Sequence, residues 1–186
     1  MNRSSLFVSS DLQPGDLIVS RKGGGNLFQK TLNSLIEGVG RRRYGEGGLF
    51  LRSNHVRVCI RSGLLQFFHW TWPKSETVWF ENWMLDPSYA VVCRPKFTVP
   101  SSLLDYAVDN VGSWYNVGLL LDIYFGLSFE LFSLGLDNEV CSTGAAEMLE
   151  QPNHRRAIPA DFLNLPELFE FVNYDNSVIE LRKEPS

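Results

Sequence analysis

Residues 117–136, with the sequence VGLLLDIYFGLSFELFSLGL, form the most apolar stretch of the chain, and their number is close to that of a membrane span. Asp122 and Glu130 interrupt the stretch, Gly126 lies in its middle, and no basic flank follows it. These interruptions favour a segment that lines a core or a groove over one that crosses a bilayer. Peripheral contact of residues 117–136 with a membrane surface stays open as an alternative.

The rest of the composition is that of a globular protein. The 186 residues, 44% hydrophobic and 13% aromatic, predict a single domain over residues 1–186. Three cysteines exclude a dense disulfide framework. A net charge of −4 argues against a specific nucleic-acid partner. The apolar run near the N-terminus is too short for a signal peptide, so the expected location is cytoplasmic or virion-associated.

The charge is unevenly distributed along the chain. Residues 21–52 carry seven basic and two acidic side chains, whereas residues 101–186 carry four basic and 14 acidic ones. Eight of the 15 glycines also fall between positions 23 and 48. This basic, glycine-rich segment is interpreted either as a solvated loop or as a loop that meets an anionic polymer or headgroup.

Hydrophobic periodicity predicts an α+β fold. The expected strands cover residues 17–19, 54–60, 64–70, 77–80 and 90–93, with a turn at 61–63. The expected helices begin at Asn26 and end at Gly38 or Gly40, follow Ser102, and run over 140–150 after a cap at Asp137 or Asn138. In the strand from Asn54, alternation places Val56, Val58 and Ile60 toward the core and His55, Arg57 and Cys59 on the other face.

Cys141 is the main candidate for chemistry, because it lies at the expected first turn of a helix. The positive end of a helix dipole favours the thiolate, which is the nucleophilic form. The alternative is a buried structural thiol, the more common fate of a lone cysteine. Cys59 and Cys93 are interpreted as structural. No CxxC pair, histidine pair at ligand spacing or GxSxG motif is present, so we expect neither a metal site nor serine-hydrolase chemistry, and no cofactor.

Two of the three histidines are candidate partners of that thiol. His55 begins its strand on the face away from the core set and can be presented at a cleft. His69 lies on the expected neighbouring strand, where it either fills an aromatic cluster or orients His55 as the third member of a Cys–His–X arrangement. His154 is expected to be solvated.

Five short motifs occur in an order that resembles the circularly permuted papain-like amidases, the YiiX/YebB-like relatives of NlpC-type cell-wall peptidases and lecithin retinol acyltransferases. They cover residues 12–172. The motifs are Leu12–Ile18 (LQPGDLI), Ser53–Val58 (SNHVRV), Gly112–Asn116 (GSWYN), Val140–Ser142 (VCS) and Ile158–Phe162 (IPADF), the last followed by Pro166–Phe169 (PELF).

The resemblance implies a permuted papain-like fold with a small antiparallel sheet or barrel packed against helices. It also implies that Cys141 is the nucleophile, His55 the general base and His69 the third member. Tyr115 would assist the oxyanion hole. Asn116, in place of the family's usual Asp, and Asn54, in place of a Ser directly before the histidine, depart from the pattern.

The expected function is therefore that of a cysteine hydrolase of amide or isopeptide bonds, with bacterial cell-wall peptide as the leading substrate. One alternative is a lipid-directed acyltransferase or thioesterase, acting on an amide or ester. Another is a non-catalytic binding or structural module, for example a phage tail component with contacts in a cell wall or virion assembly.

Overall fold

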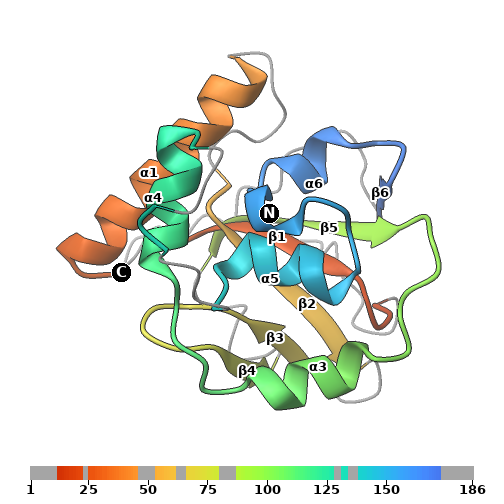
Figure 1. The fold of residues 1–186 in the computed structure, drawn as a ribbon. Coiled ribbons are helices and arrows are strands. Elements are labelled where there is room, and N and C mark those ends of the chain that lie inside the picture. The colour runs from red at the N-terminus through yellow and green to blue at the C-terminus, as the bar shows by residue number, and fades with distance from the viewer. Residues whose placement is uncertain are drawn as a thin grey trace, which may run out of the picture.

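The computed structural model describes residues 12–22, 25–45, 53–61, 66–79, 87–127, 131–133 and 138–172. In these ranges the fold is α+β, and Figure 1 shows helices in front of a twisted sheet. The described residues form six strands: β1 (Leu17–Lys22), β2 (His55–Arg61), β3 (Gln66–His69), β4 (Glu76–Trp79), β5 (Pro87–Pro95) and β6 (Phe169–Phe171). They also form five α-helices and one 3₁₀-helix: α1 (Leu27–Tyr44), α3 (Leu103–Asn110), α4 (Val117–Phe125), α5 (Cys141–Met148), η2 (His154–Arg156) and α6 (Asp161–Asn164).

The strands form one open antiparallel sheet in the order β4-β3-β2-β1-β5-β6, so β1 lies between β2 and β5. Within this sheet Leu17 pairs with Val58 on one side and with Cys93 on the other. The sheet does not close among the described residues, which fits the predicted small sheet rather than a barrel.

The two faces of the sheet bury different clusters. The main core lies between the sheet and the helices and includes Val56, Val58 and Ile60, as the alternation in β2 predicts. Cys59 lies in a smaller cluster on the other face, with Ile18 and Phe67. The prediction is therefore confirmed for Val56, Val58, Ile60 and Cys59, whose side chains alternate between the two faces. His55, predicted on the face of Cys59, instead lines a cavity with Leu32 and Ile36 of the main core.

Helix α1 begins as predicted but ends later than predicted. Asn26 caps it by accepting a hydrogen bond from the Gln29 N–H, and the Gln29 side chain accepts one in return from the Asn26 N–H, at 2.9 and 3.1 Å. The helix continues through Gly38 and Gly40 to Tyr44, so the predicted stop is wrong. Glycine in a helix costs only about 1 kcal/mol relative to alanine, which the burial of Ile36 and Val39 in the core outweighs.

Only the first part of the apolar stretch 117–136 is helical among the described residues. Helix α4 ends at Gly126, which adopts the left-handed conformation (φ 68°). Asp122 is buried, and its carboxylate accepts from the backbone N–H groups of Leu131, Phe132 and Ser133, at 3.1, 2.9 and 2.9 Å. Burial acts to raise the pKa of Asp122, but these donors outweigh it and hold the pKa below its usual value.

The charge within the apolar stretch therefore fastens residues 131–133 against α4. Gly118 allows the same approach, since a Cβ there would lie 2.2 Å from the carbonyl oxygen of Phe132. In the described part of the chain, no helix has the length and apolar character required to cross a bilayer.

Other elements differ from the predictions at their ends. The predicted strands at 64–70, 77–80 and 90–93 appear as β3, β4 and β5, with bounds shifted by a few residues. Strand β6 is not predicted, because three residues are too few to show a period. Most of the basic segment 21–52, predicted as a loop, is helix α1 instead. Its residues 23–24 and 46–52, residues 62–63 of the predicted hairpin turn, and residues 128–130 and 134–137 lie outside the described residues.

Helix α5 packs closely on the sheet through Gly144. A Cβ at this position would lie 2.3 Å from the ring of the buried Trp70. We therefore expect Gly144→Ala to destabilise the protein by about 1–3 kcal/mol, as overpacking does. The free energy of unfolding in urea measures the effect.

A second glycine provides the matched control. At Gly38, a Cβ would meet its nearest neighbour, the ring of Tyr124, at 3.7 Å, which is ordinary van der Waals contact. Gly38→Ala should raise stability by up to about 1 kcal/mol through helix propensity. Equal stability changes in the two variants would contradict the close packing of α5 on Trp70.

Candidate active site

Cys141 is the first residue of α5. The preceding Val140 is extended, and its N–H donates to the hydroxyl of Thr143 at 2.9 Å, which ties the chain at the entry of the helix. The predicted cap at Asn138 is wrong, because the helix begins after Val140; Asp137 lies outside the described residues. The thiol is nevertheless at the N-terminus of a helix, as predicted.

The Cys141 side chain points into the start of β2. It is 2% exposed, and its sulfur donates to the backbone carbonyl of Asn54 at 3.8 Å. Burial raises its pKa to about 11, although the N–H of Val56, the guanidinium of Arg57 and the N–H groups at the start of α5 act in the opposite direction. The helix dipole thus does not by itself produce a thiolate, because desolvation dominates.

Tyr115 reaches the same thiol from the segment before α4. Its hydroxyl lies within hydrogen-bonding reach of the Cys141 sulfur, and its side chain is buried. Burial, followed by the nearby Cys141, raises the pKa of Tyr115 well above its usual value. The phenol therefore keeps its proton at physiological pH and can donate it to a sulfur or an oxyanion.

The two candidate histidines form a hydrogen-bonded pair across β2 and β3. Nε2 of His55 lies 2.6 Å from Nδ1 of His69, with the rings at right angles. On the far side of the pair, Nε2 of His69 lies 3.3 Å from a carboxylate oxygen of Glu76 on β4. The three side chains form a row, which we call the relay, from the edge of the sheet toward its centre. The hydrogen bond between the two rings orients the imidazole of His55.

A chain of contacts links the predicted site residues. Cys141 contacts Asn54 and Val56, the residues on either side of His55, and Tyr115 contacts Cys141. His69 contacts His55. Each sequence-predicted residue therefore lies at one location, where α5, β2, β3 and the segment before α4 meet.

Asn116 connects Tyr115 to the entry of α5. Its side-chain oxygen accepts from the Leu119 N–H at 2.8 Å and caps α4, while its side-chain nitrogen donates to the Asn138 carbonyl at 3.0 Å. Its own N–H donates to the Glu139 carbonyl at 3.1 Å. One side chain thus acts as acceptor and donor, which an amide can do and a carboxylate cannot.

These contacts give Asn rather than Asp at position 116 a physical reason, and they predict the effect of introducing Asp there. Asn116→Asp should place a carboxylate against the Asn138 carbonyl and destabilise the protein by about 1–3 kcal/mol. Thermal unfolding at neutral pH measures the loss. Asn164→Asp is the control, since Asn164 also donates to a backbone carbonyl, that of Ala160, but near the surface.

Asn54 has a supporting contact on its other side. Its side-chain nitrogen donates to the buried carboxylate of Glu37 on α1 at 3.0 Å, and Arg21 on β1 donates to the same oxygen at 3.3 Å. The residue whose carbonyl accepts from Cys141 is therefore held by α1 and β1 together. The sequence analysis noted Asn54 only as a departure from a motif and did not predict its contact with Glu37.

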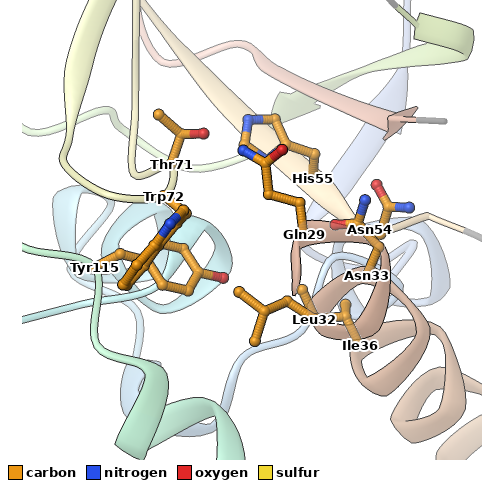
Figure 2. A pocket seen from close by; sticks show the side chains of 9 residues that line it. All are labelled: Gln29, Leu32, Asn33, Ile36, Asn54, His55, Thr71, Trp72 and Tyr115. Carbon is orange, nitrogen blue, oxygen red and sulfur yellow. The ribbon is translucent and has the colours of Figure 1, made fainter. Parts of the chain in front are cut away.

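A cavity of about 30 Å³ lies beside this cluster. Figure 2 shows Trp72 and Tyr115 on one side and α1 on the other, with His55 above. The other residues that line the cavity are Gln29, Leu32, Asn33, Ile36, Asn54 and Thr71. This volume holds a water molecule or two but no peptide, so a substrate must displace side chains of α1 to reach His55.

A second, larger cavity of about 660 Å³ lies at the other flank of α5. It is lined by residues of α1, α5, η2 and α6, among them Arg43, His154 and Asp161. Neither Cys141 nor His55 is among its lining residues, so it is separate from the candidate active site.

One group of side chains in the described ranges has the residue types of a metal site. Ligand atoms of Glu139, Glu147 and His154 lie within 4.8 Å of one another. Arg155 donates to Glu139 at 2.9 Å, and Tyr106 donates to Glu147. Because both carboxylates are already engaged, we interpret the group as an ion-pair network that fastens η2 to α5. His154 is half-buried in it rather than solvated as predicted.

Two site residues were not predicted as functional. Arg57 was assigned to a face of β2 but not to the thiol, and Glu76 lay directly before the expected strand at 77–80. Alternation places Arg57 and His55 on the same face, and this pattern was a signal for Arg57. No pattern in the sequence pairs His69 with Glu76.

Comparison of the chain with protein-family models, curated proteins and solved structures finds no match.

Proposed function

We propose that this protein is a cysteine hydrolase that cleaves amide or isopeptide bonds through a thioester on Cys141. The observation that carries the proposal is the location of this thiol at the start of α5, in contact with Tyr115 and with both neighbours of His55. A nucleophile, a base with an orienting partner and a hydrogen-bond donor then lie within one cluster.

The proton is proposed to move from Cys141 to His55 as the sulfur attacks the carbonyl carbon. The thiol now donates to the carbonyl of Asn54, so its side chain must turn from that oxygen toward the imidazole of the next residue. Nε2 of His55 faces His69, which leaves Nδ1 as the nitrogen that takes the proton. Catalytic hydrogen bonds often form only with substrate bound.

The tetrahedral intermediate places a negative charge on the former carbonyl oxygen. The Cys141 N–H and the Tyr115 hydroxyl are the proposed donors to it. His55 then gives its proton to the leaving amine, and water hydrolyses the thioester, which returns the thiol. The pairing of His69 with Glu76 supports the charge that His55 acquires in the first step.

The same reasoning favours a circularly permuted papain-like fold within the α+β class, since the histidine strand precedes the cysteine helix in this chain. With that fold, bacterial cell-wall peptide is the leading substrate, and acyl lipids are the alternative. An assay with two substrates separates them: the protein is incubated with purified peptidoglycan or with phospholipid vesicles, and products are identified by mass spectrometry. Cleaved peptide supports the proposal, and released fatty acid reassigns the substrate.

One observation favours a second candidate, a non-catalytic module with the same fold. Cys141 is buried and the cavity next to it is small. If neither substrate is consumed and Cys141 resists alkylation by a fluorescent iodoacetamide, the site is structural.

The pH dependence of this alkylation provides a further prediction. Among the three cysteines, burial raises the pKa least for Cys141, to about 11, compared with about 12 for Cys59 and a still higher value for Cys93. Because only the thiolate reacts, the labelling rate should rise about tenfold per pH unit below pH 11. Cys141 should be labelled before Cys59 and Cys93. Peptide mapping locates the label, and a rate independent of pH would contradict the prediction.

A further inference from the structure

We propose that the C-terminal ends of α1 and α4 form a surface that docks on anionic phospholipid membranes. This inference does not depend on the chemistry of Cys141. It rests on exposed aromatic side chains next to arginines, on described residues. Figure 1 shows α1 and α4 side by side at one edge of the molecule.

The apolar part of this surface consists of Phe125, Leu131 and Phe132, which are 57%, 50% and 43% exposed. The rings of Phe125 and Phe132 are 5.8 Å apart, and Tyr124 lies 5.2 Å from Phe125. These side chains therefore form one continuous patch. Large exposed apolar patches mark sites of interaction with proteins or membranes.

The patch is held in place by buried groups beneath it. Asp122 binds the backbone of residues 131–133, and Gly118 lets that backbone approach α4. The side chains of Leu131 and Phe132 point outward from this fixed backbone. Their exposure is therefore part of the fold.

Cations flank the patch on two sides. The Arg42 guanidinium lies 4.4 Å from the centre of the Tyr124 ring and donates to the Tyr124 carbonyl. Arg156 donates to the Leu127 carbonyl at 3.2 Å, just past the end of the same helix. Both side chains are exposed. The simple interpretation is that they cap the C-terminus of α4, whose free carbonyls favour cations.

Within the described ranges, no carboxylate pairs with Arg42 or Arg156. Among the described residues, the partners of Arg42 and Arg156 are backbone carbonyls and an aromatic ring, whereas Arg43 pairs with Asp161 and Arg41 lies 3.9 Å from Glu37. Among the described residues, the carboxylate of Asp122 on α4 is turned inward onto the backbone N–H groups of residues 131–133.

Aromatic rings flanked by arginines that pair with no described carboxylate match the interface of an anionic bilayer, where rings enter the headgroup region and guanidinium groups meet phosphates. A protein partner would need an acidic apolar surface of the same shape. A bilayer requires only that the aromatic rings and the arginines lie next to each other, and we therefore assign an anionic membrane as the partner of this surface.

The surface also has a defined relation to the candidate active site. Tyr115 and Asn116 immediately precede α4, and Phe125 is its last residue. At 1.5 Å per residue the helix separates the two ends by about 12 Å. The patch extends along α4 toward its Tyr115 end, because the Phe132 carbonyl approaches Gly118 in the first turn of the helix.

Vesicle co-sedimentation tests the inference with the intact chain. The protein should sediment with vesicles of equal parts phosphatidylcholine and phosphatidylglycerol, less with pure phosphatidylcholine, and less as ionic strength increases. The double variant Phe125→Ser/Phe132→Ser should lose binding. Each of Arg42→Gln and Arg156→Gln should weaken it about fivefold, the equivalent of one basic side chain near the surface.

Matched controls use similar residues away from the patch. Val108→Ser/Trp114→Ser removes two exposed apolar side chains, and Lys30→Gln removes an exposed cation; both should bind as the parent does. Arg42→Lys keeps the charge and should retain binding, and circular dichroism checks that each variant folds. Failure of the parent to bind the anionic vesicles, or undiminished binding by the double phenylalanine variant, would overturn the inference. So would self-association that the double variant abolishes without vesicle binding by the parent, which would assign the patch to a second copy.

Discussion

Replacing Cys141 with alanine should abolish turnover of the substrate identified in the peptidoglycan and vesicle assay, with a loss on the order of 10³-fold or more. Cys141 is the proposed source of the attacking atom, since Tyr115 holds its proton at a raised pKa and the two imidazoles are the proposed base and its partner. The rate of product release, measured by mass spectrometry, tests this.

The fold should survive the same substitution. The sulfur makes a long hydrogen bond of 3.8 Å to Asn54, so its removal costs little beyond a small cavity. Cys93→Ala is the matched control: it removes an equally buried sulfur from β5 and should leave turnover unchanged. Turnover by Cys141→Ala at the parent rate would refute Cys141 as the nucleophile.

The second large effect should come from His55. His55→Gln should lower turnover by about 10²–10⁴-fold, the range for loss of a general base. His69→Gln should lower it less, because His69 acts on His55 and not on the substrate. Glu76→Gln should have the smallest effect, since the Glu76 side chain is more than half exposed and water replaces its interaction with His69.

The order of these three effects distinguishes the relay from a structural role. If His69 only fills space, His69→Gln should change stability and leave turnover per folded molecule unchanged. His154→Gln controls for loss of an imidazole elsewhere, because His154 lies on η2 away from His55. A loss of turnover for His69→Gln that equals or exceeds the loss for His55→Gln would contradict the assigned roles.

The fold class was predictable because its signals are periodic. Alternation in β2 separated Val56 and Val58 from Cys59, and the capped start of α1 at Asn26 followed from side-chain chemistry at one position. These signals depend on neighbours in the sequence. The end of α1 could not be predicted from such signals, because packing of Val39 against the core overrides the helix-breaking tendency of Gly38 and Gly40.

The residues of the candidate site were predictable, but their burial and their contacts with one another were not. Its members could be named from their types and order, whereas the raised pKa of Cys141 depends on burial by elements distant in the sequence. The contact of Glu76 with His69 depends on the register of β3 against β4, where the two residues pair directly. Neither burial depth nor register is encoded in a short motif.

The central place of β1 in the sheet has a consequence for how the molecule is made. Leu17 pairs with both Val58 and Cys93, so β1, the first of the described strands, cannot complete its pairing until β5 has emerged from the ribosome. Such non-local pairing slows folding. Helix α5 follows later still and packs on β2. A partly synthesised chain therefore carries His55 without Cys141, and the candidate active site is assembled late.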